Sequence, residues 1–348
     1  MTIDRRVSEP FMYIHFILIY PRKQNPIHIF MNGPVQDELT ETLKPSVGTA
    51  TAFVPGHITG FFKIHDASSN LLERGSTGAG FCITAGTVTT IELVEQDEHD
   101  VLVTYNGERI KAEITEMVVE RVSELYGKRF SAKVEHDSEL PIGVGYGASG
   151  AGALGTALAM NYILDSEMTP QVAAQYAHYA EVAKQGGLGD VIAQFTGGME
   201  IRTRPGAPGI GEIDPFRCES PVSVVLAGST GLETKSVLSN EGYRRRINER
   251  GSQLVGGMRD RPTCEQFIKA SRDFAHFTGL MSDRIDAALS ELDNANLKNS
   301  SMVMLGDSLF CLCSQSDVDR ARNILTDYWM PEEMLVTTIA NRGGGILH

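Results

Sequence analysis

The stretch LPIGVGYGASGAGALGTALAMNYIL, residues 140–164, is the most informative part of the sequence. Its glycine-rich first half runs into an Ala- and Leu-rich second half, which predicts a loop followed by a helix from about Ser149 to Leu164. Small residues cover most faces of that helix, so we expect it to be buried. Unpaired backbone N–H groups at a helix N-terminus favour an anion, and the run from Gly145 to Ala151 offers many of them. The alternative is that the small residues only allow close packing.

Two common types of glycine loop do not fit the context. Gly145, Gly147 and Gly150 spell G-x-G-x-x-G, and Asp165 follows about 20 residues after the first glycine, as in dinucleotide-binding folds. Such a fold needs a second strand that ends at the acidic residue, whereas here one continuous helix leads to Asp165. A Walker A loop is excluded because G-x-x-x-x-G-K-[ST] occurs nowhere. A different kind of anion loop is therefore predicted.

Further elements can be placed on both sides of this loop. A second helix is predicted from about Pro170 to Lys184, with Thr169 as its N-cap. Asn106-Gly107 lies between two β-prone runs and predicts a hairpin. Strands are predicted near residues 49–54, 88–94, 101–105, 133–136, 222–227, 308–313 and 334–340. Strands and helices in both halves, without regular βα alternation, predict an α+β fold.

The chain is expected to have three parts. Residues 1–47 contain several prolines and no sustained periodicity, so we expect a poorly ordered N-terminal extension. Its apolar run, residues 11–20, is too short to span a bilayer and lacks the small-residue cleavage site of a signal peptide. We expect one domain at residues 48–205 and a second at residues 216–348, joined by the Pro- and Gly-rich segment between them as a linker.

Charge and cysteine usage narrow the class of function. Lys and Arg total 31 against 44 Asp and Glu, which gives a net charge of −13, and no basic stripe could neutralise a phosphate backbone. We therefore expect a small-molecule partner rather than nucleic acid or a membrane, and leave a homodimer open. The five cysteines are widely spaced and include no C-x-x-C pair, so neither disulfides nor a zinc site are predicted. This usage indicates a cytoplasmic protein.

The sequence PIGVGYGASGA, from Pro141, resembles the phosphate loop P-x-x-x-G-L-G-S-S-A-A of the GHMP kinases, which include galactokinase, homoserine kinase and mevalonate kinase. Ser149 matches the second Ser of that pattern, while Tyr146, Ala148 and Gly150 depart from it. The resemblance begins near Thr49 and implies a two-domain fold. Its N-terminal domain would be like domain 2 of ribosomal protein S5, and its C-terminal domain would be ferredoxin-like.

The resemblance also implies ATP and Mg²⁺ as cofactors and assigns roles to several residues. The triphosphate would be held by Gly143, Gly145, Gly147, Ala148, Ser149, Gly150 and Ala151. Mg²⁺ would be bound by Ser149 and Glu181, and Asp190 would be the catalytic base that takes the proton of the attacking hydroxyl. From the residues alone, Ser149 and Asp190 could be helix caps and Glu181 could lie on a solvated helix face.

The smaller loops bear on the substrate. The runs AFVPGHITGFF from Ala52, GSTGAGF from Gly75, GGLGDVIAQFTGG from Gly186 and MLGDSLF from Met304 are most similar to archaeal pantoate kinases, which implies phosphorylation of (R)-pantoate for coenzyme A synthesis. His57, Ser76 and Arg202 are then the substrate candidates, with Arg202 for the carboxylate. His57 stands where many GHMP kinases have a lysine, and it could equally be a hydrogen-bonded structural histidine. The alternatives are homoserine, mevalonate or shikimate as substrate, or a non-catalytic nucleotide sensor.

Overall fold

The fold is described by a computed structural model, which covers residues 46–97, 99–165, 168–218, 223–231 and 234–347. Residues 1–45 of the expected extension lie outside the described residues, whereas residues 46 and 47 begin the first strand. The described residues form one compact unit in which helices and sheets are mixed, so the α+β fold is confirmed.

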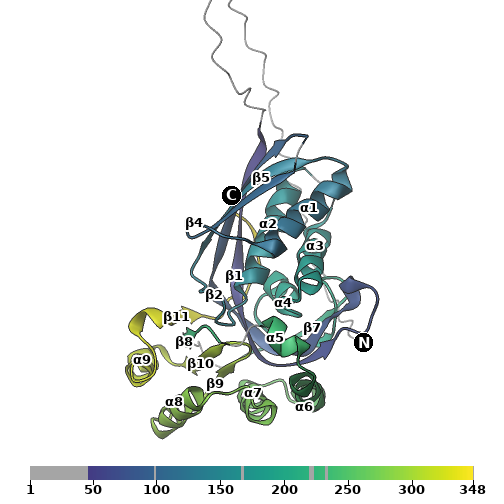
Figure 1. The fold of residues 1–348 in the computed structure, drawn as a ribbon. Coiled ribbons are helices and arrows are strands. Elements are labelled where there is room, and N and C mark those ends of the chain that lie inside the picture. Colours follow the sequence, from purple (N-terminus) through teal and green to yellow (C-terminus); the bar gives the residue numbers. More distant parts are fainter. Residues whose placement is uncertain (1–45, 98, 166–167, 219–222, 232–233, 348) are drawn as a thin grey trace, which may run out of the picture. The chain divides into compact units, whose positions relative to one another are not determined.

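Two long antiparallel strands form the centre of the larger sheet (Figure 1). They are β1 (Ser46–His65) and β2 (Gly75–Glu95), and their register places Thr51 opposite Thr90. The sheet order is β12-β1-β2-β5-β3-β4, with β6 and β7 attached beside β2. The other strands are β3 (Asp100–Tyr105), β4 (Glu108–Arg109), β5 (Phe130–Ser138), β6 (Met199–Arg204), β7 (Glu212–Phe216) and β12 (Gly345–Leu347).

Helices cover one face of this sheet, as Figure 1 shows for α1 to α3. They are α1 (Glu113–Tyr126), α2 (Ala148–Ile163), α3 (Pro170–Ala183) and the short α4 (Asp190–Thr196). Helix α2 is buried from Gly150 to Met160 and packs against β1 and β2. A Cβ atom at Gly155 would lie 2.5 Å from Thr89 Oγ1, so the small residues of α2 are what allow it to approach the sheet.

A second, four-stranded sheet has the order β11-β8-β10-β9. Its strands are β8 (Ser223–Ser229), β9 (Ser300–Val303), β10 (Asp307–Cys313) and β11 (Met334–Thr338). The associated helices are α5 (Thr234–Ser239), α6 (Glu241–Asp260), α7 (Cys264–Thr278), α8 (Asp283–Asn294) and α9 (Val318–Leu325). Phe267 of α7 contacts Phe81 of β2 and Phe310 of β10, so one aromatic cluster joins the two sheets.

Several local predictions are confirmed. Strands β3 and β4 pair antiparallel across Asn106-Gly107, where both residues have positive φ. Thr169 caps α3 by accepting from the backbone N–H of Val172.

The interpretation of residues 205–215 as a linker is wrong, because β7 pairs with β6 in the larger sheet. Strand β12, near the C-terminus, also returns to this sheet beside β1.

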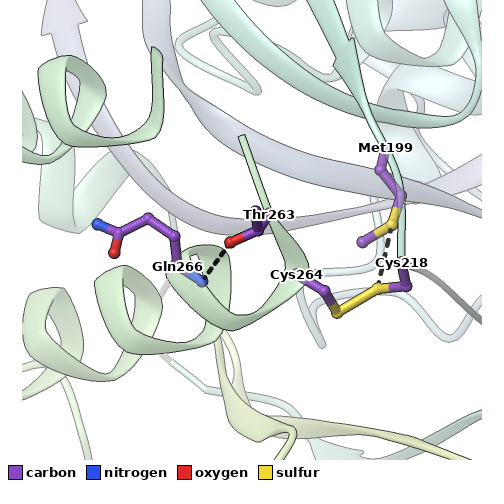
Figure 2. The surroundings of a disulfide bond; sticks show 5 residues. All are labelled: Met199, Cys218, Thr263, Cys264 and Gln266. Atoms are coloured by element: carbon purple, nitrogen blue, oxygen red, sulfur yellow. Dashed lines mark hydrogen bonds between the residues drawn. A yellow bond between two sulfur atoms is a disulfide. The ribbon is translucent and has the colours of Figure 1, made fainter. Parts of the chain in front are cut away.

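The prediction that the cysteines form no disulfide is also wrong. Cys218, after β7, is bonded to Cys264 at the start of α7 (Figure 2). An isolated parallel bridge between Arg217 and Thr263 brings the two segments together. The two cysteines are 46 residues apart, and this pairing depends on tertiary structure that the spacing cannot reveal. Within the described ranges, no helix is long and apolar enough to cross a membrane.

Candidate active site

The glycine-rich loop before α2 has the backbone geometry of an anion site. Gly143, Gly145 and Gly147 have φ values of 83°, 86° and 72°, so left-handed residues alternate along the loop. Such alternation turns successive N–H groups toward one point. Gly147 is the N-cap of α2, and no side chain caps the helix, so its first N–H groups remain available to a ligand. Ser149 is therefore not the cap.

The loop opens on a cavity of about 540 Å³. Of the loop residues predicted to bind phosphate, the lining includes Gly143, Gly145, Gly147, Ala148 and Ser149. Gly150 and Ala151 are buried in the first turn of α2 and do not line it. Ser76 and Asp190 line the same cavity, so the predicted phosphate loop, catalytic carboxylate and one substrate candidate share one space. Apolar walls come from Phe62, Leu238, Met304 and Leu305.

Glu181 lies near the end of α3 and is fully buried, so the solvated-face alternative is wrong. Its Oε2 accepts from the backbone N–H of Gly187, and its side chain is also hydrogen-bonded to Ser149. Its Oε1 has no hydrogen-bond partner within the described part of the chain. Burial, together with the nearby carboxylate of Asp190, raises the pKa of Glu181 to about 7.

These features of Glu181 fit a magnesium ion. Mg²⁺ prefers oxygen ligands and is usually held by one or two carboxylates together with substrate phosphates. Ser149 and Glu181 would supply a hydroxyl and a carboxylate, and the unpartnered Oε1 would gain a ligand. Among the described residues no cluster of three or more His, Cys, Asp or Glu side chains could hold a metal alone. A cation here would therefore need further ligands such as phosphates.

Asp190 is the first residue of α4, and its side chain is 23% exposed. Gly189 is the N-cap of α4, so the alternative that Asp190 is only a helix cap is wrong. His57 Nδ1 lies 2.7 Å from Asp190 Oδ1. Burial opposes ionisation of Asp190, but the hydrogen bond from His57 and the charges of His57 and Arg202 outweigh it and lower the pKa. A Cβ at Gly187 would overlap Asp190 Oδ2, so the loop before α4 needs glycine there.

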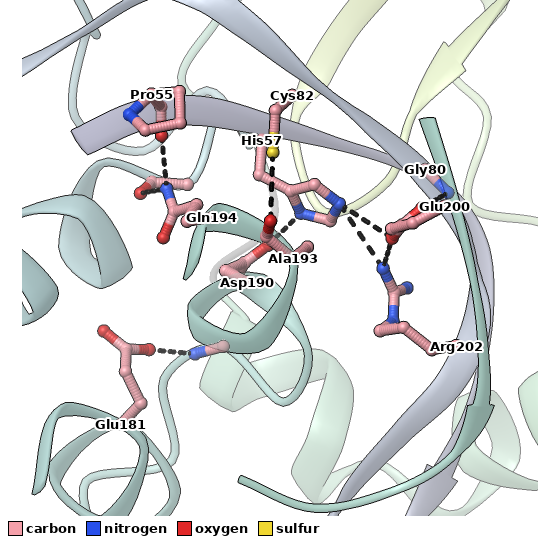
Figure 3. A network of polar contacts seen from close by, with 12 residues as sticks. Pro55, His57, Gly80, Cys82, Glu181, Asp190, Ala193, Gln194, Glu200 and Arg202 are labelled. Carbon is pink, nitrogen blue, oxygen red and sulfur yellow. Dashed lines mark hydrogen bonds and ion pairs between the residues drawn. The ribbon is translucent and has the colours of Figure 1, made fainter. Parts of the chain in front are cut away.

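His57 does not line the cavity and is fully buried. Figure 3 shows its ring between Asp190 and Glu200, and both ring nitrogens have protein partners. The substrate contact predicted for His57 is thus not what the structure shows, because no surface of the ring is left for a ligand. The other alternative, a hydrogen-bonded histidine within the protein, describes it better.

Arg202 lies on β6 and is 1% exposed. Its Nη1 donates to Glu200, with which it forms a buried ion pair, while Nε and Nη2 have no partner among the described residues. A Cβ at Gly189 would lie 2.5 Å from Ser76 Oγ and 2.7 Å from Arg202 Nε. The hydroxyl of Ser76 and Nε of Arg202 therefore lie close to Gly189, one residue before Asp190, but Arg202 is buried and does not line the cavity.

Two site residues were not found from the sequence. Glu200 accepts from the backbone N–H of Gly80 at 2.6 Å and lies against His57. Its spacing of two from Arg202 on a strand places both side chains on one face, a signal that could have indicated the pair. Gln194 of α4 donates to the carbonyl of Gly147 at 2.9 Å and so ties the phosphate loop to the helix that begins with Asp190. No sequence pattern indicated Gln194.

The chain is similar to known proteins in both sequence and fold. Residues 112–198 match the family described as the GHMP kinases N-terminal domain. The chain is 38% identical to the pantoate kinase of Thermococcus kodakarensis over 81% of this chain and 94% of that protein. It is 34% identical to the pantoate kinase of Methanocaldococcus jannaschii over 78% of this chain and 96% of that protein. A solved structure titled as a phosphotransferase related to the CoA biosynthesis pathway has a TM-score of 0.77 and 34% identity, and covers 86% of this chain and 99% of its own.

Proposed function

Because the chain belongs to the pantoate kinase family of the GHMP kinases, we propose that it transfers the γ-phosphoryl group of ATP to the primary hydroxyl of (R)-pantoate. The product would be (R)-4-phosphopantoate, an intermediate of coenzyme A synthesis. The observation that carries the proposal is the shared cavity, in which an uncapped helix N-terminus and its glycine loop face the carboxylate of Asp190. The match to the solved phosphotransferase structure, with a TM-score of 0.77, also supports the GHMP kinase fold that the sequence resemblance implies.

Residues that line the cavity, together with the buried Glu181 next to it, have separate roles in phosphoryl transfer. The backbone N–H groups of the loop from Gly143 to Gly147 and of the first turn of α2 hold the triphosphate. Ser149 and Glu181 hold Mg²⁺, which neutralises phosphate charge when bound. Asp190 accepts the proton as the substrate oxygen bonds to the γ-phosphorus and the bond from that phosphorus to the bridging oxygen of ADP breaks. The lowered pKa of Asp190 keeps this base ionised at neutral pH.

Pantoate offers a carboxylate, two hydroxyls and a gem-dimethyl group to the protein. Nε and Nη2 of Arg202 have no partner among the described residues and form the planar fork that binds a carboxylate with two parallel hydrogen bonds. Because both atoms are buried and Arg202 does not line the cavity, this contact requires the side chain to move toward the substrate. Ser76 Oγ lies beside this fork and can bond a substrate oxygen. Phe62 and Leu238 supply apolar lining for the methyl groups. This division supports a small hydroxy acid over an uncharged alcohol.

The proposal is tested by incubating the protein with ATP, Mg²⁺ and one candidate substrate at a time, and measuring ADP formation. Pantoate, homoserine, mevalonate and shikimate form the panel, and a reaction without acceptor gives the background. We expect pantoate to give the highest kcat/KM, with a product phosphorylated on the primary hydroxyl by ³¹P NMR. A higher kcat/KM for another acceptor would overturn the substrate. Nucleotide binding without turnover on any acceptor would favour the sensor.

Cytoplasmic localisation remains a prediction from cysteine usage. The disulfide between Cys218 and Cys264 removes part of its basis, because these two cysteines are paired rather than free. The cysteines that remain free in the described part of the chain, Cys82, Cys311 and Cys313, are all buried. Determining the redox state of Cys218 in freshly prepared protein, by thiol alkylation and mass spectrometry, tests this prediction. The homodimer likewise remains a prediction.

A further inference from the structure

A fully buried imidazole ring separates two carboxylates at the site (Figure 3). His57 Nδ1 lies 2.7 Å from Asp190 Oδ1, and His57 Nε2 lies 3.1 Å from Glu200 Oε1. An ionised carboxylate only accepts hydrogen bonds, so Nδ1 donates to Asp190. Nε2 faces both an acceptor, Glu200 Oε1, and a donor, Arg202 Nη1 at 3.3 Å, and a proton on Nε2 that donates to Glu200 makes the ring an imidazolium cation. Burial disfavours this cation, but the hydrogen bonds to Asp190 and Glu200 outweigh burial and raise the pKa of His57.

The ring is fixed from the side opposite to Asp190. Glu200 is held by the backbone N–H of Gly80 at 2.6 Å and by the ion pair with Arg202, so its Oε1 has a defined position against the ring. Cys82, opposite His57 in the register of β1 and β2, has a pKa raised well above its usual range by burial and by nearby carboxylates, so its thiol is neutral. In the described structure, the charged groups facing His57 are therefore Asp190 from α4 and Glu200 and Arg202 from β6.

We propose that His57 is a positioning residue for the reaction: its Nδ1–H fixes Oδ1 of Asp190, which leaves Oδ2 to receive the proton of the substrate hydroxyl. This inference rests on the proposed phosphoryl transfer and adds a residue that contacts neither substrate nor nucleotide. Asp190 alone has a freely rotating carboxylate at the start of a short helix. The bond to a ring clamped by Glu200 removes that freedom and places a positive charge beside the base.

Two substitutions of His57 separate positioning from simple packing. The amide nitrogen of Asn lies near the place of a histidine Nδ1, whereas that of Gln lies near the place of Nε2. His57→Asn therefore keeps a donor for Asp190, and His57→Gln keeps a donor for Glu200 while losing the bond to the base. We expect kcat to fall about 10- to 100-fold in His57→Gln, with KM for ATP and pantoate within about twofold of wild type, because misplacement of a reacting group by about 1 Å costs up to 10²-fold. His57→Asn should retain at least several-fold more kcat.

The pH profile gives a readout that packing alone would not move. Removing the imidazolium removes a charge that lowers the pKa of Asp190, so the acid limb of kcat should move to higher pH in both variants. The matched control is His65→Gln, on the same strand, where the ring is hydrogen-bonded to Thr77 and, among the described residues, to no carboxylate. We expect its kcat and acid limb to equal those of wild type.

The kinetics of all variants are measured with whichever acceptor the wild-type protein phosphorylates. The test of His57 therefore remains valid even if pantoate is not the substrate. Equal kcat in His57→Gln and His57→Asn with an unmoved acid limb overturns the positioning role. So does a kcat for His57→Gln within twofold of wild type. Circular dichroism and Tm check the fold of each variant. If both His57 variants unfold, Glu200→Gln serves instead, because it keeps the shape of the side chain beside the ring. We then expect the acid limb of the kcat–pH profile to move, and an unchanged acid limb in Glu200→Gln rejects the proposal.

Discussion

Replacing Asp190 by Asn is the most direct test of the catalytic carboxylate. The change keeps the size and shape of the side chain but removes the proton-accepting charge. His57 donates to Oδ1, so the carboxamide oxygen of Asn will occupy that position and its NH₂ group will replace Oδ2. The atom that should receive the proton thus becomes a hydrogen-bond donor, and no base remains. Because Gly189 is the N-cap, α4 does not depend on the charge of Asp190 for its start.

The expected size of the effect follows from this exchange. A positioned general base contributes roughly 10²- to 10⁴-fold to the rate, which is about 3 to 5 kcal/mol of transition-state stabilisation at 1.36 kcal/mol for each factor of ten. Ground-state binding should change little, because the carboxamide fills the same space. We therefore expect kcat to fall by that factor while KM for ATP and pantoate stays within a few-fold.

The assay is ADP formation at saturating ATP and pantoate, followed by a single-turnover measurement that isolates the chemical step from product release. Nucleotide binding by calorimetry serves as the control for an intact site. A kcat for Asp190→Asn within about threefold of wild type in both experiments would refute the assignment of the base. It would also weaken the kinase mechanism, because Asp190 is the carboxylate that lines the cavity beside the phosphate loop and whose pKa is lowered by His57 and Arg202.

The other predictions concern the metal and the substrate carboxylate. Ser149→Ala and Glu181→Gln should each raise the Mg²⁺ concentration for half-maximal rate about tenfold or more and leave KM for pantoate nearly unchanged; a Mg²⁺ titration identical to wild type excludes the metal role. The pKa of Glu181 lies at about 7, above its unfolded value, so the ligand-free protein should lose stability as pH rises from about 4.5 through 7, and Glu181→Gln should flatten that slope in a Tm series. Arg202→Lys keeps the charge but not the planar fork, and should raise KM for pantoate more than KM for ATP; an equal rise in both contradicts carboxylate binding.

The parts of the fold predicted from the sequence depend on short-range chemistry. The glycine loop and α2, the Thr169 cap of α3 and the hairpin at Asn106-Gly107 each follow from a few adjacent residues whose backbone preferences point to one conformation. Strand β1 is longer than the sequence predicts. The sequence predicts a strand only near residues 49–54, whereas a register shift between Pro55 and Gly56 lets the strand continue to His65.

The remaining features arise from contacts between residues far apart in the sequence. His57 and Asp190 are separated by 133 positions, and His57 and Glu200 by 143. A single sequence shows which side chains can titrate, but only the packing of β1 against β6 and α4 decides that this histidine meets carboxylates on both sides. The sequence therefore left a substrate contact and a structural histidine as equal alternatives. The same holds for the disulfide, which depends on the bridge between Arg217 and Thr263.

The buried charges at the site argue that ligand binding completes this fold. Glu200 and Arg202 are each 1% exposed, and removing an ion from water costs several kcal/mol, which pairing only partly offsets. Within the described residues, Nε and Nη2 of Arg202 and Oε1 of Glu181 have no hydrogen-bond partner, and each of these atoms costs about 1 to 3 kcal/mol or more while it stays unsatisfied. A bound anion beside Arg202 and a cation beside Glu181 would satisfy both. The apparent stability should therefore rise more with both ligands present than with either one alone, because each site is incomplete without its ligand.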